Sequence, residues 1–359
     1  MKRLIREPRT VGTLTFHWAV NFGAVVQAYA LQKALLRLGH DGAVLNYVPA
    51  RVVAGEVLQR LKDRDWRYFV RCLSLRWFVV RNIHLAPRLP IQSRPGLRSF
   101  CDARFRAVVV GSDQVWNEWF VMQSSASANL TYFLEFLSGR VRRIAYAVSF
   151  GSPSLGDAAR TEVLLEVRRF HRLAVREHTG SDILRGMGVE SELVLDPSLL
   201  LQAEDYLELC RQVPADRSYV LVYLLHSGQS VWAKFAKERI ARRFGGRARI
   251  VRESEIFSMS GWLNAIRGAD FVFTNSFHVV AFCLLFHTPF VALPVSGGLA
   301  GMNDRLATLL GLCGLGDRLI FDSEADARIM DQNIVWSEVD SALDSSRLRS
   351  IRFLVEALE

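Results

Sequence analysis

Apolar residues recur along the chain in two patterns, short continuous runs and stripes at helical spacing, and the two patterns alternate. Short runs bounded by turn residues are typical of strands buried on both faces, whereas the stripes indicate amphipathic helices. In the first half the expected strands are 11–16, 43–48, 107–110, 144–148, 173–175 and 193–195, and the expected helices are 22–38 and 53–83. Prolines at 87, 90 and 95 predict a loop after the second helix.

The alternation starts again after a break near residues 196–205. The expected strands here are 219–225, 248–251, 271–274, 290–295 and 318–321, and the expected helices are 231–244, 260–268, 277–287, 303–312 and a tail from Ser337. Two such series predict an α/β protein with two doubly wound Rossmann-like domains that face a cleft, where ligands of such sheets bind. We expect an N-terminal domain at 1–200, with a basic helical insertion at 51–104, and a C-terminal domain at 201–359 that ends in helices.

Polar residues interrupt the apolar pattern at the junction between strand 271–274 and helix 277–287. Asn275 and Ser276 are candidates to cap the helix, and His278 follows them in its first turn. The free N–H groups at the start of a helix favour an anion, so we infer a ligand that carries phosphate and carboxylate. The alternative is a packed core histidine, and only the position of His278 speaks against it.

Further polar groups follow the strands of the first domain. The candidate substrate-binding residues are His17, Asn21 and Gly23 after strand 11–16, and Gly111, Ser112, Gln114 and Trp116 after strand 107–110. Asp113, in the second group, is a candidate to take a proton from a hydroxyl. Ordinary strand-to-helix turns would also explain these segments, with Trp116 as a core residue.

Two more segments could bind an anion. Arg176, directly after strand 173–175, suits bidentate binding of phosphate or carboxylate, although a surface pair with Glu177 is the alternative. Ser296 and Gly297 lie in a loop after strand 290–295 that could fold over an anion.

Charge, cysteine content and absent motifs limit the partners and the classes of protein that fit this sequence. The net charge is +9, and segment 51–104 alone has twelve Arg or Lys and four acidic residues. Nucleic acid, an anionic polysaccharide or a membrane surface could each be its partner, but a solvated helical face is an equal alternative. The five cysteines form no CxxC or Cys/His cluster, so we expect no metal site, no disulfide framework and a cytoplasmic location. The absence of GxSxG, HExxH, Walker and GxGxxG motifs disfavours the common hydrolases, P-loop NTPases and dehydrogenases.

Seven blocks together resemble, in order, the polysaccharide pyruvyl transferase family. They are TFHWAVNFGAVVQAYALQKAL, VVVGSDQVWN, IAYAVSFG, VREHTG, LVLDPSLLL, TNSFHVVAF and NDRLATLLGLCGLGDRL. The resemblance implies a fold like the GT-B glycosyltransferases, with phosphoenolpyruvate as co-substrate and no cofactor. It also implies a sugar diol of a cell-surface polysaccharide or its precursor as acceptor, free or lipid-linked.

The same resemblance implies roles for individual residues. Arg176 and His278 match positions that hold or protonate phosphoenolpyruvate, and the NFGA and GSDQ segments would line the acceptor side. The chain departs from the family pattern at Phe22, where tyrosine is usual, at Asn275, where aspartate is common, and at Val279, where glycine is common. The Cβ and methyl groups of Val279 put a close approach of the donor to that helix in doubt.

Ketal formation needs an acid for the methylene carbon, for which His278 is suited, and a base for a sugar hydroxyl, for which Asp113 is the candidate. Two other readings stay open: a GT-B glycosyltransferase that uses a nucleotide sugar, and a non-catalytic glycan-binding or assembly protein of the same fold. We also expect peripheral contact with an anionic membrane through 51–104, at the inner face of the membrane, and no binding of nucleic acid. The residues proposed for that contact are Arg60, Arg64, Arg67, Arg71 and Trp77.

Overall fold

The computed structural model describes residues 10–122, 129–210, 218–225, 230–244, 249–295, 301–321 and 325–359. The chain divides into two compact units. The first comprises Met1–Phe69, Arg76–Leu201 and Leu348–Glu359, and the second comprises Val70–Leu75 and Gln202–Arg347. The main boundary between the units therefore lies between Leu201 and Gln202. The assignment of the whole C-terminal tail to the second domain was wrong, because Leu348–Glu359 belongs to the first unit.

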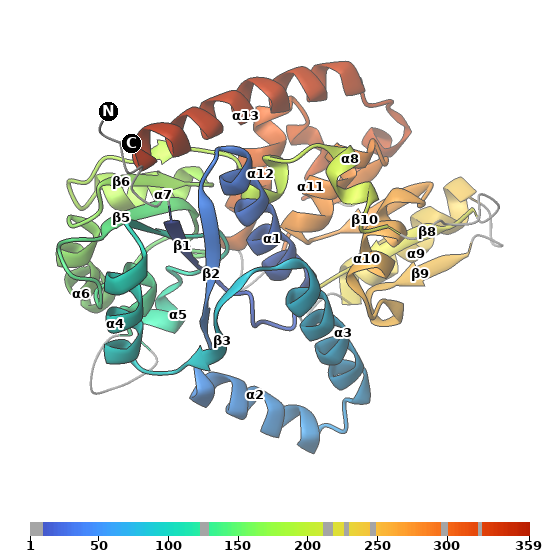
Figure 1. Ribbon diagram of the computed structural model, residues 1–359. Helices are drawn as coiled ribbons and strands as arrows, with labels where there is room; N and C mark the ends of the chain where they lie inside the picture. The colour runs from blue at the N-terminus through green and yellow to red at the C-terminus, as the bar shows by residue number, and fades with distance from the viewer. Residues whose placement is uncertain are drawn as a thin grey trace, which may run out of the picture. The chain divides into compact units, whose positions relative to one another are not determined.

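The first unit is built on a parallel sheet with seven strands in its described part (Figure 1). Its strands are β1 (Thr10–Leu14), β2 (Asp41–Tyr47), β3 (Leu85–Ile91), β4 (Ala107–Val110), β5 (Arg142–Val148), β6 (Arg172–Val175) and β7 (Glu192–Leu193). The spatial order is β3-β2-β1-β4-β5-β6-β7, so the winding direction reverses between β1 and β4. A reversal of this kind opens a crevice at the carboxyl ends of the two strands, which is where such sheets bind ligands.

Both faces of this sheet are covered. Its helices are α1 (Phe22–Arg37), α2 (Ala50–Lys62), α3 (Trp66–Asn82) without its middle part Val70–Leu75, α4 (Arg94–Arg104), α5 (Glu118–Val121), α6 (Asp157–Val167), α7 (His178–Arg185) and the end of α13 (Trp336–Leu358). In β4, Val108 and Val110 join a core with residues of α4, α6 and α7, whereas Ala107 and Val109 join a core with residues of α1 and α13. Alternate side chains of a strand point to opposite faces, which explains why the whole run is apolar.

The insertion is less helical than its sequence pattern predicts. The expected helix 53–83 is two helices, α2 and α3, joined by a turn in which Arg64 has a φ of 52°. The expected proline loop is wrong in part, because Leu85–Ile91 forms strand β3 and pairs with β2. Proline cannot donate to a ladder, but an edge strand has one side without a neighbour, so β3 tolerates Pro87 and Pro90 there.

The second unit holds a parallel sheet of four strands within its described residues, in the order β11-β10-β8-β9. The strands are β8 (Val220–Tyr223), β9 (Ile250–Arg252), β10 (Phe271–Thr274) and β11 (Phe290–Ala292), and the helices are α8 (Ala203–Leu207), α9 (Ser230–Phe244), α10 (Met259–Arg267), α11 (Phe277–Phe286), α12 (Asn303–Leu312) and the start of α13. The expected strand 318–321 is only a single bridge, between Ala292 and Leu319, after a short 3-10 turn. The α/β class with parallel, doubly wound sheets is confirmed.

The last turns of α13 close one face of the first sheet. Phe353 is 1% exposed and lies 6.0 Å from the ring of Tyr146 on β5. Ser350, on the same helix, accepts a hydrogen bond from the backbone of Leu195 at 2.9 Å. These contacts explain why the tail belongs to the first unit.

We expect Phe353→Ala to lower the free energy of unfolding of the first unit by about 3–5 kcal/mol, because a buried aromatic ring leaves a cavity when it is removed. Leu348→Ala is the matched control on the same helix, since Leu348 is 67% exposed and its loss should change stability by less than about 0.5 kcal/mol. Urea unfolding of both variants measures the difference. Equal effects would show that the tail does not stabilise the sheet.

Candidate functional site

Polar side chains from three strand ends meet at the carboxyl edge of the first sheet. Ser112 and Asp113 follow β4, Arg176 and Glu177 follow β6, and Asp196 follows β7. Carboxyl ends of parallel strands lie at one edge, so residues that are up to 84 positions apart in sequence come into contact. The structure therefore brings together three of the predicted residues, Ser112, Asp113 and Arg176.

Arg176 lies at the centre of this group. Its Nη1 donates to Asp196 Oδ2 at 2.8 Å and to Ser112 Oγ at 3.1 Å. Ser112 Oγ donates in turn to Asp196 Oδ2 at 2.6 Å. Two further carboxylates, Asp113 and Glu177, each lie 3.7 Å from the guanidinium. We call these five residues the Arg176 cluster.

The cluster is buried, and this decides its electrostatics. The side chains of Arg176 and Asp196 are 0% exposed. Burial disfavours the positive charge, but the attraction of Asp196, Asp113 and Glu177 outweighs it and raises the pKa of Arg176. The guanidinium is therefore always charged, and direct contact with a phosphate would require a rearrangement of its contacts with the carboxylates. Its binding of phosphoenolpyruvate stays a prediction.

Asp113 is the carboxylate of the cluster that reaches the surface most, with 16% of its side chain exposed against 3% for Glu177. Its backbone has a φ of 82°, a conformation that non-glycine residues adopt rarely and at a cost. The backbone is held there by its neighbours: Ser149 donates to the carbonyl of Asp113, and the N–H of Gln114 donates to its carboxylate at 2.8 Å. A strained residue that its surroundings fix at a strand end is a candidate for function.

Two predicted substrate-binding residues of the first unit have side chains buried in the core. Trp116 is 0% exposed, stacks on Phe133 at 4.7 Å and donates to the carbonyl of Tyr132. His17 is 3% exposed and contacts Asn46 Oδ1 at 3.3 Å. A position after a strand does not reveal whether the side chain turns inward, and binding of substrate by these two residues stays a prediction.

The remaining predicted residues of the first unit cap a helix or take part in close packing in this structure. Asn21 caps α1 by accepting from the N–H of Ala24 at 3.1 Å, and Gly23 is buried in the first turn. Gly111 packs where a Cβ would lie 3.1 Å from Thr15, so its small size serves the contact between strand and helix. Gln114 covers Gly151, which the sequence reasoning missed: at its φ of +60° a Cβ would lie 2.4 Å from Gln114 Oε1. Gly151 is the glycine at the end of the block IAYAVSFG, directly after a predicted strand.

The second set of predicted residues lies at the junction of β10 and α11 in the second unit. Ser276 caps α11 and accepts from the N–H of Val279 at 3.5 Å. His278 is in the first turn, is 7% exposed and meets the ring of Phe277 edge-on. The first turn contains no acidic residue, so the N–H groups there keep their preference for an anion.

Asparagine amides clamp the backbone on either side of this junction. Asn275 accepts from the N–H of Leu225 at 2.7 Å and donates to its carbonyl at 2.8 Å. Asn303 does the same for Val295, with both distances at 2.8 Å. Leu225 follows β8 and Val295 follows β11, so the clamps fix the carboxyl ends that flank β10. Asn275 thus has a structural role, and Asn303 was missed because its partner is a backbone group.

The other two predicted residues, Ser296 and Gly297, lie outside the described residues. No group of three or more His, Cys, Asp or Glu suited to a metal ion occurs in the part of the chain that the structure describes. In the same part, none of the helices is long and apolar enough to cross a membrane.

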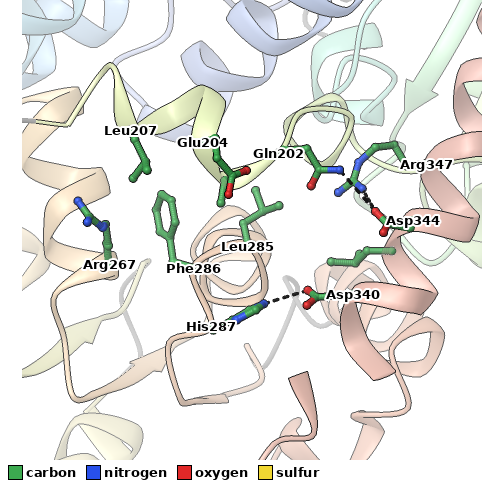
Figure 2. A pocket seen from close by; sticks show the side chains of 12 residues that line it. Gln202, Glu204, Leu207, Arg267, Leu285, Phe286, His287, Asp340, Asp344 and Arg347 are labelled. Atoms are coloured by element: carbon green, nitrogen blue, oxygen red, sulfur yellow. Dashed lines mark hydrogen bonds and ion pairs between the residues drawn. The ribbon is translucent and has the colours of Figure 1, made fainter. Parts of the chain in front are cut away.

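A cavity of about 420 Å³ in the second unit contains none of the predicted residues (Figure 2). Its lining includes Phe286 at the end of α11 and His287, which pairs with Asp340 at 2.9 Å. Because α11 begins at the carboxyl edge of the sheet, these residues lie one helix length away from His278. The cavity is therefore distinct from the β10–α11 junction.

Comparisons with known proteins support the fold and the family. A family model described as polysaccharide pyruvyl transferase matches residues 21–297. The structure of a UDP-N-acetylglucosamine 2-epimerase from Neisseria meningitidis is similar with a TM-score of 0.52 at 10% identity, covering 97% of this chain and 98% of that one. A structure from Listeria monocytogenes assigned to the same activity gives 0.50 at 11% identity, covering 94% and 90%. Such low identities show the fold alone, which is of the GT-B type. No curated protein matches the chain at a significant level.

The burial of His17 predicts a specific dependence of stability on pH. Burial lowers the pKa of His17 from 6.5 to about 4, so the unfolded chain binds its proton first as the pH falls. Stability is lost as the pH falls through 6.5, and the loss is complete near 4. Relative to His17→Gln, we expect the wild-type protein to lose about 2–3 kcal/mol between about pH 7.5 and about pH 4.5. Urea unfolding of both proteins across this range measures it, and a difference that does not change with pH would contradict the assignment of a neutral core histidine.

Proposed function

The chain belongs to the polysaccharide pyruvyl transferase family, and we propose that it transfers pyruvate from phosphoenolpyruvate to two hydroxyls of one sugar, forming a cyclic ketal. The acceptor is a cell-surface polysaccharide or its precursor, free or lipid-linked. The observation that carries the proposal is the extent of the family match: residues 21–297 include both the Arg176 cluster and the β10–α11 junction.

The proposed reaction has two additions to one carbon. A proton is added to the methylene carbon of phosphoenolpyruvate, and the first sugar hydroxyl attacks the adjacent carbon as it loses its own proton to a base. Phosphate leaves with the electrons of its C–O bond, and the second hydroxyl forms the second C–O bond and releases its proton. The products are the ketal and inorganic phosphate. The steps need an acid, a base and a site that favours anions, and we assign these roles below.

For the donor we propose the second unit. His278 is an imidazole in the first turn of α11, where the helix presents N–H groups and no acidic residue competes for them. A phosphate or carboxylate near these groups is favoured by the helix dipole. The neighbouring strand ends are held by the neutral amides of Asn275 and Asn303, so these two contacts add no negative charge that would repel a multiply charged anion.

For the acceptor we propose the first unit. The Arg176 cluster contains three carboxylates and one guanidinium, so its surroundings disfavour an anion and suit an uncharged diol. Asp113 is the proposed base, because it is the carboxylate of the cluster with the most exposed side chain. In this proposal Arg176 is a positioning residue: it holds Asp113 and keeps the other two carboxylates neutralised.

The first test measures phosphate release. We expect release from phosphoenolpyruvate only when a suitable saccharide is present, and we expect His278→Gln and Asp113→Asn each to lower kcat by at least about a hundredfold. His287→Gln is the matched control, a histidine at the other end of the same helix with an exposed partner, and it should retain activity.

Other outcomes decide between the readings of the sequence. Stabilisation by a nucleoside diphosphate in thermal unfolding, with no response to phosphoenolpyruvate, would favour a glycosyltransferase. Saccharide binding without phosphate release, equally strong in His278→Gln, would favour a non-catalytic protein. Either result would overturn the proposal.

The second test concerns Arg176. If it positions Asp113, Arg176→Lys should lower kcat about tenfold to a hundredfold and leave KM for phosphoenolpyruvate within about twofold, since a lysine keeps the charge but loses the paired geometry. Ser112→Ala, which removes one partner of the guanidinium, should shift kcat in the same direction by less. A large rise in KM for phosphoenolpyruvate with unchanged kcat would instead show that Arg176 contacts the donor.

A further inference from the structure

Helix α3, which Figure 1 shows as a long helix after α2, carries a continuous stripe of exposed apolar side chains. The stripe consists of Trp66, Val70, Leu73, Trp77 and Val80, spaced alternately four and three residues apart. Their exposed fractions are 61%, 42%, 72%, 61% and 77%. This spacing places all five on one face of a helix, so the exposed surface is one strip and not scattered positions.

The opposite face of α3 already supplies the packing that holds the helix. Tyr68, Leu75, Phe78 and Val79 are between 2% and 8% exposed. The helix therefore has two apolar faces, of which only one is used in the fold. Monomeric soluble proteins rarely expose contiguous apolar strips of this size unless a partner binds them.

Arginines border the exposed stripe. At 100° per residue, Arg67 and Arg81 fall on one side of the stripe and Arg76 on the other, and all three are exposed. The fourth arginine of α3, Arg71, points to the buried side and forms an ion pair with Glu253 at 2.6 Å. The helix contains no Asp or Glu, so all charged residues that border the stripe on α3 are positive.

The tryptophans and arginines are also paired with each other. The guanidinium of Arg67 lies 5.6 Å from the ring of Trp66, and that of Arg81 lies 5.2 Å from the ring of Trp77. Tryptophan favours the boundary between headgroups and acyl chains, while arginine favours anionic headgroups. An apolar stripe with Trp, flanked by cations, is the composition of a helix that lies in the plane of a membrane interface.

We propose that α3 binds the surface of an anionic lipid bilayer, with the five-residue stripe inserted among the headgroups and Arg67, Arg76 and Arg81 on lipid phosphates. Two leucines of the preceding helix α2, Leu58 and Leu61, are also 58% and 56% exposed. A second copy of this chain is the less suitable occupant, because it would bring two uncompensated rows of arginine together.

The structure also shows which of the arginines expected to touch lipid are paired with carboxylates. Arg60 pairs with Asp65 at 3.2 Å and Arg71 pairs with Glu253, so these two of the arginines expected from the sequence to touch lipid are engaged with carboxylates. The inference does not rest on the proposed pyruvyl transfer, although attachment to a bilayer would bring the protein to a lipid-linked acceptor.

The test is sedimentation of the full-length protein with vesicles of phosphatidylcholine alone or of equal parts phosphatidylcholine and phosphatidylglycerol. The wild-type protein should sediment with the anionic vesicles, and molar salt should weaken the binding. Replacing Leu73, Trp77 and Val80 with serine should lower partitioning by more than tenfold. Arg67→Gln, Arg76→Gln and Arg81→Gln combined should lower it about a hundredfold, since each cation near an anionic surface contributes about fivefold.

The matched control is Leu165→Ser with Leu348→Ser, which removes two exposed leucines, at 71% and 67%, from α6 and α13. It should bind as the wild-type protein does. Brominated lipid should quench tryptophan fluorescence in the wild-type protein and much less in Trp66→Phe with Trp77→Phe.

Three results would overturn the proposal. The first is equal binding to neutral and anionic vesicles, and the second is wild-type binding by the serine variant. The third is light scattering that shows a dimer which the serine variant dissociates without lipid, because the stripe would then contact a second copy. Phosphate release with a free saccharide should be unchanged in the serine and glutamine variants, so failure of this inference can be told apart from failure of the proposed reaction.

Discussion

A single buried guanidinium holds the first unit's candidate site in place. An isolated charge inside a protein costs several kcal/mol, so Arg176 and its three carboxylates can be buried only together. They come from the ends of β4, β6 and β7, and the contacts of Asp196 with Ser112 and Arg176 and of Asp113 with Arg176 therefore also fix one strand end relative to another. The position of Asp113, at an unfavourable φ and beside the guanidinium, follows from that arrangement. The geometry of this candidate site thus depends on the mutual neutralisation of buried charges.

In the second unit, hydrogen bonds from uncharged side-chain amides fix the strand ends. Asn275 and Asn303 each bond both backbone groups of one residue, an arrangement that holds the chain as a neighbouring strand would. The two units therefore differ in local field: the first offers a carboxylate beside a compensated cation, the second an uncharged helix terminus.

The sequence predicts the strands and their order of appearance well, because a run such as Ala107–Val110 is apolar only when both faces of a sheet are covered. It fails at β3, whose prolines indicate a loop when the edge position is unknown. It does not reveal that His17 and Trp116 are buried, since the pattern gives their place after a strand but not the direction of the side chain. The contacts of Asp196 and Asn303 join distant or backbone partners, which no local pattern contains.

The placement of β3 has a consequence for how the protein behaves in a crowded solution. It is one border of the first sheet, and Pro87 and Pro90 remove N–H groups that an incoming strand would need. The other border, β7, has only the two residues Glu192 and Leu193, and Arg172 bridges Glu192 to Glu356 on α13. Both edges of the sheet therefore oppose pairing with a strand of another chain, through the two prolines at β3 and through the short length of β7.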